Sequence, residues 1–167
     1  VRTPGQRINV MHELFADDLP RLKQRFDELA AEQAKADGHQ MLLIGRRHVR
    51  DMNSWLHNLK PYVRGKNRCT IKVNPLDAER IGLVEGGTAK VVTHVGEANV
   101  PVEVSPEMME GVVSIPHGFG HIYGDSQQSL AESALPGISC NDLIDESLDV
   151  ASSTCVVNGV PVQVYAH

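Results

Sequence analysis

The chain has 167 residues, a formal net charge of -5 and 41% hydrophobic residues. This length suits one domain with a short appendage, and the hydrophobic content is enough for a packed core. The negative net charge excludes the global basic field that is typical of nucleic-acid-binding proteins. Aromatic residues make up only 4% of the chain, so a core must be built mainly from Val, Ile, Leu and Ala.

The three cysteines, Cys69, Cys140 and Cys155, form no C-x-x-C pair. Their odd number and their spacing argue against a disulfide framework and against a zinc or iron–sulfur site made by this chain alone. Free thiols suit a reducing compartment, so we expect a cytoplasmic location. We expect no membrane span and no signal peptide. Because the chain begins with Val1, we expect it to be part of a longer protein.

The first 40 residues predict one amphipathic helix after an irregular start, in which residues 8–10 have strand character. Apolar residues recur at steps of three and four up to about residue 36: Leu19, Leu22, Phe26 and Leu29. Asp17 and Asp18 are N-cap candidates, Pro20 fits a first turn, and Asp37-Gly38 fits the end. We expect the apolar stripe to pack on the following domain or on another part of the protein.

From Met41 onward the sequence changes to short β segments separated by turns. Strands are predicted over residues 41–44, 68–74, 88–94, 98–104 and 112–115, with one bent or two short strands over 155–165. Asn74-Pro75 and Gly82 delimit a short helix between the second and third strands. This pattern favours a small β-barrel or sandwich, with residues 1–40 as a linker and helix and residues 41–167 as the β domain.

The first polar segment directly follows the strand at 41–44. It holds Arg46, Arg47, His48 and Arg50, and then Asn53, Ser54, His57 and Asn58 around Trp55. The planar fork of Arg suits phosphate, while Asn and Ser offer donors and acceptors to a heteroaromatic edge. A nucleotide-like cofactor, with a pyrophosphate and flat rings, is the simplest ligand that uses both. The alternative is a solvated, partly salt-bridged surface with Trp55 as a core or interface anchor.

Two further polar segments lie in the strand-poor region 116–153. Residues 116–121 read PHGFGH, and the two glycines allow a backbone to approach a ligand closely. His117 and His121 could share a metal on a helix, but the glycines disfavour a helix, and a turn with hydrogen-bonded histidines is the alternative. Asn141-Asp142 is either a turn or a carboxylate that accepts from the ring N–H and amino groups of a purine such as guanine.

A family resemblance is carried by these segments and their neighbours: LIGRRHVRDMNSWLHN, KNRCTIKVNPLDAERIGL, GGTAKVVTHVGEANVPVEV, MMEGVVSIPHGFGH, GISCNDLIDE and NGVPVQV. Together they resemble the C-terminal molybdopterin-dinucleotide-binding domain of molybdopterin oxidoreductases, in the dimethyl-sulfoxide-reductase superfamily. Within it the pattern is most similar to formate dehydrogenase-like catalytic subunits. The resemblance covers residue 41 to the end. It implies a mainly β fold, a double-psi β-barrel of the aspartate-decarboxylase-like type with a short crossover helix, preceded by the N-terminal helix.

The resemblance implies a molybdenum or tungsten bis(molybdopterin guanine dinucleotide) cofactor in the full-length protein, which this domain anchors and covers. Carried over by position, the residues fall into groups that face phosphate, pterin with ribose, the pterin–metal side, and guanine: Arg46, Arg47 and Arg50; Asn53, Ser54, His57 and Asn58; His117, Gly118, Gly120 and His121; Asn141 and Asp142. The sequence departs from the family at Asp51-Met52, where small polar residues are expected, and at Gly86-Gly87, where the family usually has Gly-Asp.

The superfamily ligates its metal through a Cys, selenocysteine, Ser or Asp of another domain, and many members carry an upstream iron–sulfur cluster. We therefore expect no catalytic or metal-ligating residue in this chain, no activity of the chain alone, and no cofactor in the isolated piece. The implied partners are electron-transfer subunits and the remaining domains of its own subunit, with no nucleic acid. Two alternatives stay open: a non-catalytic double-psi barrel that binds a protein partner, and a small hydrolase using His117 or His121 with Asp142.

Overall fold

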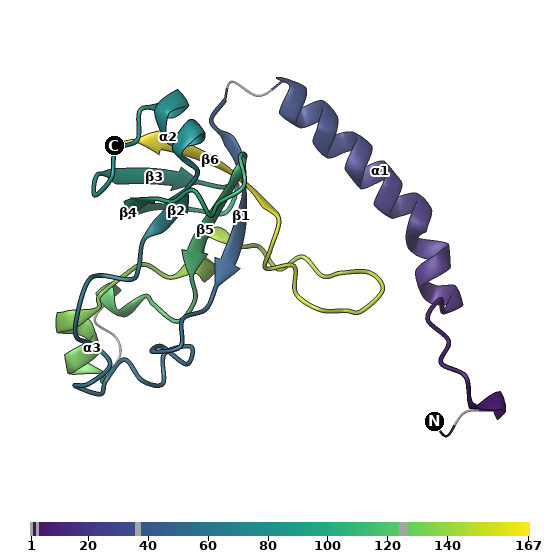
Figure 1. The fold of residues 1–167 in the computed structure, drawn as a ribbon, viewed down its shortest axis with the longest axis horizontal. Coiled ribbons are helices and arrows are strands. Elements are labelled where there is room, and N and C mark those ends of the chain that lie inside the picture. The colour runs from purple at the N-terminus through teal and green to yellow at the C-terminus, as the bar shows by residue number, and fades with distance from the viewer. Residues whose placement is uncertain (1, 3, 36–37, 124–126) are drawn as a thin grey trace. The chain divides into compact units, whose positions relative to one another are not determined.

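The computed structural model describes residues 2, 4–35, 38–123 and 127–167. The chain divides into two compact units, one formed by Val1–Ala36 with Leu148–Cys155 and the other by Asp37–Ser147 with Val156–His167. All six strands in the described residues belong to the second unit, which Figure 1 shows as a small barrel.

The strands close into a barrel in the order β1-β5-β2-β4-β3-β6. Their bounds are β1 Gln40–Arg46, β2 Ile71–Val73, β3 Thr88–Val92, β4 Glu97–Val104, β5 Val112–Pro116 and β6 Val160–Ala166. The pairs β1–β5 and β2–β4 are parallel, and the other neighbours are antiparallel. This closed, mainly β arrangement is the double-psi barrel that the sequence predicts, so the predicted fold class is confirmed.

Alternate residues of every strand point into the barrel and fill it, as the two-residue period of a strand requires. None of these inward side chains is more than 8% exposed, and none is aromatic: Met41, Leu43, Ile71, Val73, Ala89, Val91, Val100, Val102, Val113, Ile115, Val160, Val162 and Val164. The predicted aliphatic core is therefore confirmed. A second, smaller cluster of Cys69, Phe119 and Leu135 lies apart from it.

The helix α2 (Pro75–Ile81) connects β2 to β3 and has both ends predicted from the sequence. The Asn74 side chain accepts a hydrogen bond from the Leu76 N–H at 2.8 Å. Gly82 ends the helix in the left-handed region, at φ 74°. The buried Asp77 carboxylate pairs with Arg80 and accepts from the backbone N–H of Gly111, which ties the helix to the loop before β5. The predicted short helix is confirmed.

The helix α1 (Glu13–Lys35) begins four residues before the predicted N-caps, so the predicted start is wrong. The backbone N–H of Leu14 bonds to the ring of His12, and Asp18 pairs with Arg21 instead of capping the helix. Pro20 therefore lies inside the helix, where it leaves one carbonyl without its usual partner. Residues 8–10 form no strand, and the predicted end at Asp37 lies outside the described residues.

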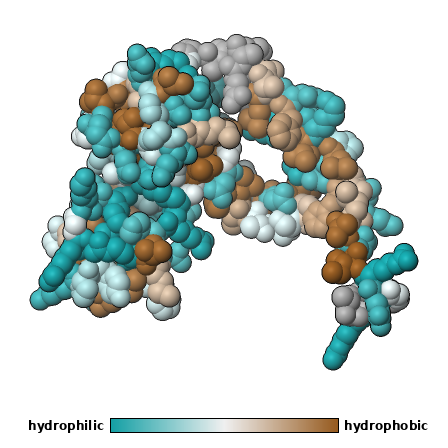
Figure 2. All heavy atoms as spheres, viewed as in Figure 1, coloured by the Kyte–Doolittle hydropathy of each residue, from teal (hydrophilic) through white to brown (hydrophobic). Residues whose placement is uncertain are grey.

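The apolar stripe of α1 is exposed on its own unit, and Figure 2 shows hydrophobic side chains along the helix. Its exposed apolar residues are Leu14, Phe15, Leu19, Leu22 and Phe26. In the described part of the chain, neither this helix nor any other combines the length and apolarity that crossing a membrane would need. Trp55, considered above as a core or interface anchor, is 80% exposed and does not belong to the core.

Two strands, β2 and β6, differ most from their predicted bounds. β2 has three residues because the carbonyls of Arg68 and Thr70, predicted as strand, accept hydrogen bonds from the Arg46 side chain. Of the residues predicted as strand over 155–165, only those from Val160 onward are in β6. The short helix α3 (Ser129–Ala134) was not predicted, and single 3-10 turns add η1 Pro4–Gln6, η2 His121–Tyr123 and η3 Cys140–Leu143.

The barrel core makes the stability of this unit sensitive to single methylene groups. We expect Leu43→Ala, at a side chain that is fully buried, to lower the free energy of unfolding by about 2–5 kcal/mol, because the cavity cannot be refilled. The matched variant Leu76→Ala, at a side chain that is 57% exposed, should change it by less than about 0.5 kcal/mol. Urea unfolding followed by far-ultraviolet circular dichroism measures both, and equal losses would contradict this core.

Candidate functional site

Three polar segments gather at one end of the barrel. The first, residues 47–66, follows β1, and the second, residues 117–121, follows β5. Because β1 and β5 are parallel neighbours with Arg46 opposite Pro116, both segments leave the barrel at the same edge. The third segment, residues 137–143, returns from α3 to this end of the barrel, as Figure 1 shows. The three polar segments therefore form one rim of the barrel.

The contact between the first two segments requires glycine at position 118. Gly118 has φ +87°, and a Cβ there would lie 2.0 Å from the carbonyl oxygen of Asn53. Beside it, Nδ1 of His57 lies 2.9 Å from Nε2 of His121. The second and third segments touch at Gly120, where a Cβ would lie 3.0 Å from that of Ser139. The rim is thus a set of close backbone contacts that larger side chains would break.

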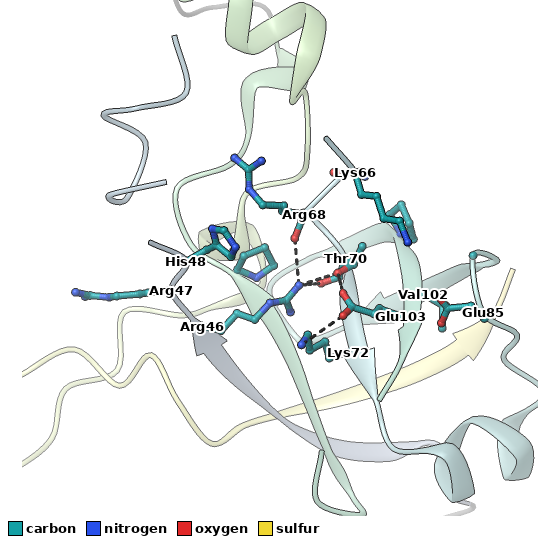
Figure 3. A pocket seen from close by; sticks show the side chains of 14 residues that line it. Arg46, Arg47, His48, Lys66, Arg68, Thr70, Lys72, Glu85, Val102 and Glu103 are labelled. Atoms are coloured by element: carbon teal, nitrogen blue, oxygen red, sulfur yellow. Dashed lines mark hydrogen bonds and ion pairs between the residues drawn. The ribbon is translucent and has the colours of Figure 1, made fainter. Parts of the chain in front are cut away.

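The Arg46 guanidinium donates its hydrogen bonds to other groups of the protein. Its Nη2 donates to the Thr70 carbonyl at 2.8 Å, to the Thr70 hydroxyl at 2.7 Å and to the Arg68 carbonyl at 3.1 Å, and its Nη1 donates to the Ser114 carbonyl. Figure 3 shows this side chain reaching across to Thr70. Burial lowers the pKa of Arg46, although Glu103 opposes the effect. Arg46 joins the end of β1 to β5 and to the residues just before β2, and its contact with phosphate stays a prediction.

A cationic pocket of about 560 Å³ surrounds the Arg46 side chain. Five Lys or Arg residues and two Glu residues line it, so its local charge is positive on a chain whose net charge is negative: Arg46, Arg47, Lys66, Arg68, Lys72, Glu85 and Glu103. Burial opposes ionisation of Glu103, but the Thr70 hydroxyl at 2.7 Å and the Lys72 ammonium at 3.3 Å lower its pKa overall. Such a pocket suits an anion.

Arg47 stands between this pocket and a second one. Arg47 and His48 line both the cationic pocket and a neighbouring pocket of about 420 Å³, whose other walls are Val49, Met52, Asn53 and Leu56. Figure 3 shows Arg47 extending away from Arg46 and Thr70. Among the described residues the Arg47 side chain has no hydrogen-bond or ion-pair partner. Arg50, by contrast, donates to the Pro61 carbonyl at 3.0 Å.

The other predicted residues of the first segment lie in different surroundings. Asn53 is exposed and has φ 58°, a left-handed conformation that Asn tolerates well. Ser54 is half-buried, and the exposed Asn58 accepts from the Leu130 N–H at 3.1 Å. The His57 side chain is fully buried, so it could touch a ligand only if the segment moved. The binding roles of these residues stay predictions.

A buried polar chain runs beneath the rim from Arg68 to His121. Nε and Nη2 of Arg68 donate to Oδ1 of Asp51 at 2.9 and 2.6 Å. Nε2 of His57 lies 3.1 Å from the same oxygen, and the other ring nitrogen of His57 faces His121. Burial lowers the pKa of His57 against the opposing effect of Asp51, and burial with the neighbouring His57 lowers that of His121. Sequence reasoning missed the Asp51–Arg68 pair, and the departure from the family at Asp51 was the available signal.

The predicted residues of the second and third segments differ in their surroundings. The His117 ring lies over Gly45, where a Cβ would be 2.1 Å from its Nε2. Asn141 and Asp142 are exposed, and the Asp142 carboxylate accepts from the Tyr123 hydroxyl, which raises the pKa of Tyr123. Within the described residues no three His, Cys, Asp or Glu side chains form a group that could hold a metal.

The lowered pKa values of His57 and His121 predict a loss of stability in acid. The unfolded chain, whose histidines titrate near 6.5, binds more protons than the folded chain as the pH falls below that value, so the free energy of unfolding falls with pH. Urea unfolding between pH 7.5 and 5.5 measures this slope. We expect His57→Asn to reduce the slope and His12→Asn, in the other unit, to leave it unchanged. A slope unaltered by His57→Asn would contradict this assignment.

Comparisons with known proteins show the family of this chain. A sequence model described as "Molydopterin dinucleotide binding domain" matches residues 41–161. A tetrathionate reductase subunit of Salmonella typhimurium is 30% identical over 126 residues, which is 65% of this chain and 12% of that protein. The corresponding tetrathionate reductase subunit of Archaeoglobus fulgidus is 35% identical over 80 residues, 48% of this chain and 7% of that protein. The chain thus corresponds to a small part of each relative.

Among solved structures, acetylene hydratase from Pelobacter acetylenicus is similar in fold. The similarity has a TM-score of 0.57 and 18% sequence identity, and it covers 84% of this chain and 19% of that one. At this identity the likeness concerns the fold alone. The family match itself covers most of the chain and the barrel's strands except most of β6. The chain therefore belongs to the molybdopterin dinucleotide-binding domain family of dimethyl-sulfoxide-reductase-type molybdoenzymes.

Proposed function

We propose that this chain is the C-terminal cofactor-binding domain of a molybdenum or tungsten bis(molybdopterin guanine dinucleotide) oxidoreductase, and that its rim anchors the dinucleotide and closes the active-site cleft. The observation that carries the proposal is the position of Arg47 and its lack of a partner among the described residues. Its guanidinium is exposed and stands between a cationic pocket and a second, partly apolar pocket. A dinucleotide needs both kinds of surface, one for its phosphates and one for its rings.

The residues present fit such a ligand in a specific way. Arg47 and the exposed Lys66 would hold phosphate, since neither has a partner within the part of the chain that the structure describes. The exposed Asp142 carboxylate, with Asn141 beside it, would accept from guanine N–H groups. When bound, the cofactor would supply two-electron chemistry at a metal held by its pterin thiolates. The chain's own share is to bind and orient the dinucleotide and to exclude water.

The reaction of the whole subunit is a further proposal. The motifs resemble those of formate dehydrogenase-like subunits, whereas the two relatives found by sequence and described above are tetrathionate reductase subunits. Formate oxidation and reduction of a sulfur oxyanion are therefore the two candidates. Assays of the full-length subunit, with formate and an oxidised viologen or with tetrathionate and a reduced viologen, separate them. The proposed partners are electron-transfer subunits and the other domains of the same polypeptide, and a cytoplasmic location stays a prediction.

Cofactor loading tests the proposed function in the full-length subunit. We expect Arg47→Ala combined with Asp142→Ala to lower the molybdenum or tungsten content several-fold. The double variant loses a hydrogen-bond donor to phosphate and a hydrogen-bond acceptor for guanine. Metal analysis of purified protein measures the effect. The control is Arg25→Ala with Asp27→Ala on α1, which removes the same residue types far from the rim in sequence. Unchanged metal content in the first double variant would contradict the proposal.

A nucleotide titration tests the same site in the isolated chain, where we expect only weak binding. Guanosine diphosphate at millimolar concentration should shift the amide NMR signals of residues 47–58 and 137–143. Arg47→Gln should reduce these shifts several-fold, and added salt should reduce them in the wild type because the contact is electrostatic. Arg25→Gln should have no effect. A barrel that only binds a protein partner would show no shifts at these segments.

A further inference from the structure

We propose that Asp51, held by Arg68, is a positioning residue of the dinucleotide site, because it fixes His57 and through it His121, and so keeps the first and second polar segments in contact. The identity of the ligand is taken from the proposed function. The arrangement of the segments is taken from this structure alone. Neither Asp51 nor Arg68 is among the residues that the family resemblance assigns to the cofactor, and position 51 is one where the sequence departs from the family.

The first step is the fixing of Asp51. Its side chain is 3% exposed, and a single oxygen, Oδ1, receives two donors from Arg68. Arg68 lies just before β2, so the carboxylate is bound to the rigid end of the barrel. The two charged donors hold Oδ1 in place. Asp51 thereby anchors the middle of a turn-rich segment that has no strand or helix of its own among its described residues.

The second step passes from Asp51 to the other segment. An ionised carboxylate only accepts, so the favourable state of His57 has its proton on Nε2, which faces Oδ1 at 3.1 Å. Nδ1 of His57 then accepts from Nε2 of His121 at 2.9 Å. His121 belongs to the segment whose Gly118 lies against Asn53. The carboxylate thus sets the protonated nitrogen of both rings and holds the two segments together.

Stability alone does not explain this junction. Within the described chain, three of the buried polar atoms that lack a hydrogen-bond partner belong to it: Oδ2 of Asp51, Nε2 of His57 and Nη1 of Arg68. The His57 nitrogen is close to the carboxylate without meeting the geometry of a well-aligned hydrogen bond. Buried charges with incomplete hydrogen bonding stabilise a fold poorly, and an apolar cluster would do so better. A role in arranging the segments accounts for their presence.

Asp77 provides a matched comparison within the same barrel unit. Like Asp51 it is a buried carboxylate that pairs with an arginine, Arg80, and it accepts from the backbone N–H of Gly111. It lies on α2, which Figure 1 shows at the end of the barrel away from α3. A variant of Asp77 therefore removes an equivalent charge without touching the rim.

The experiment compares Asp51→Asn with Asp77→Asn in the 167-residue chain. Ring ¹⁵N NMR signals of His57 and His121 report which nitrogen is protonated, amide hydrogen exchange reports the order of residues 47–58 and 117–121, and guanosine diphosphate shifts report binding. For Asp51→Asn we expect changed ring signals, at least tenfold faster exchange in both segments, weaker nucleotide shifts and an intact barrel. For Asp77→Asn we expect wild-type ring signals and wild-type exchange in both segments.

Wild-type ring signals and segment exchange in Asp51→Asn would overturn the positioning role. Loss of order in the two segments in Asp77→Asn as well would also overturn it, because the effect would then be general destabilisation. Absence of nucleotide shifts in the wild-type chain would instead count against the proposed function, and the ring signals would still decide the role of Asp51. If Asp51→Asn does not fold, Arg68→Lys replaces it. Lysine cannot donate in a fork to Oδ1, so we expect Asp51 to lose its fixed position, with faster exchange in both segments and weaker nucleotide shifts, and wild-type segment exchange would again overturn the proposal.

Discussion

The parallel pairing of β1 with β5 decides where the functional segments of this domain lie. Two parallel neighbours end at the same edge, so the chain leaves the barrel twice at one place, at Arg46 and at Pro116. Strands joined by a simple hairpin would have sent the two segments to opposite ends. Because the described strands form a closed barrel, none of them has an unpaired edge at which another chain could add. The barrel can therefore support long, irregular polar segments without an edge that promotes aggregation.

The rim assembled on this frame carries two kinds of arginine, some paired within the protein and one at the surface that is unpaired among the described residues. Arg46 and Arg68 use their guanidinium groups on backbone carbonyls and on Asp51, whereas Arg47 projects beside the cationic pocket with donors that no described residue takes up. A buried pair broken by removing one partner costs about 3–5 kcal/mol, which is a large share of a small domain's stability. Substitution of the exposed Arg47 breaks no buried pair and has no such cost. Substitutions at neighbouring arginines therefore have different consequences, although their sequence context is the same.

Much of the fold could be predicted because the relevant signals are local. Alternating valines marked the strands, and Asn74-Pro75 with Gly82 marked both ends of α2. The remaining differences come from contacts between residues distant in sequence. β2 is short because Arg46, more than twenty residues earlier, takes the carbonyls of Arg68 and Thr70. For the site, the polar segments could be found by composition, but the burial of His57 could not, since it depends on how Gly118 and Asn53 fit together.

Trp55 is the chain's single tryptophan, and it lies in the first polar segment with most of its surface in water, while the barrel's interior is wholly non-aromatic. Its indole has nearly the same surroundings in the folded and the denatured chain. The fluorescence of Trp55 therefore changes little when the barrel unfolds. The same optical signal responds instead to whatever comes to cover the surface around Trp55.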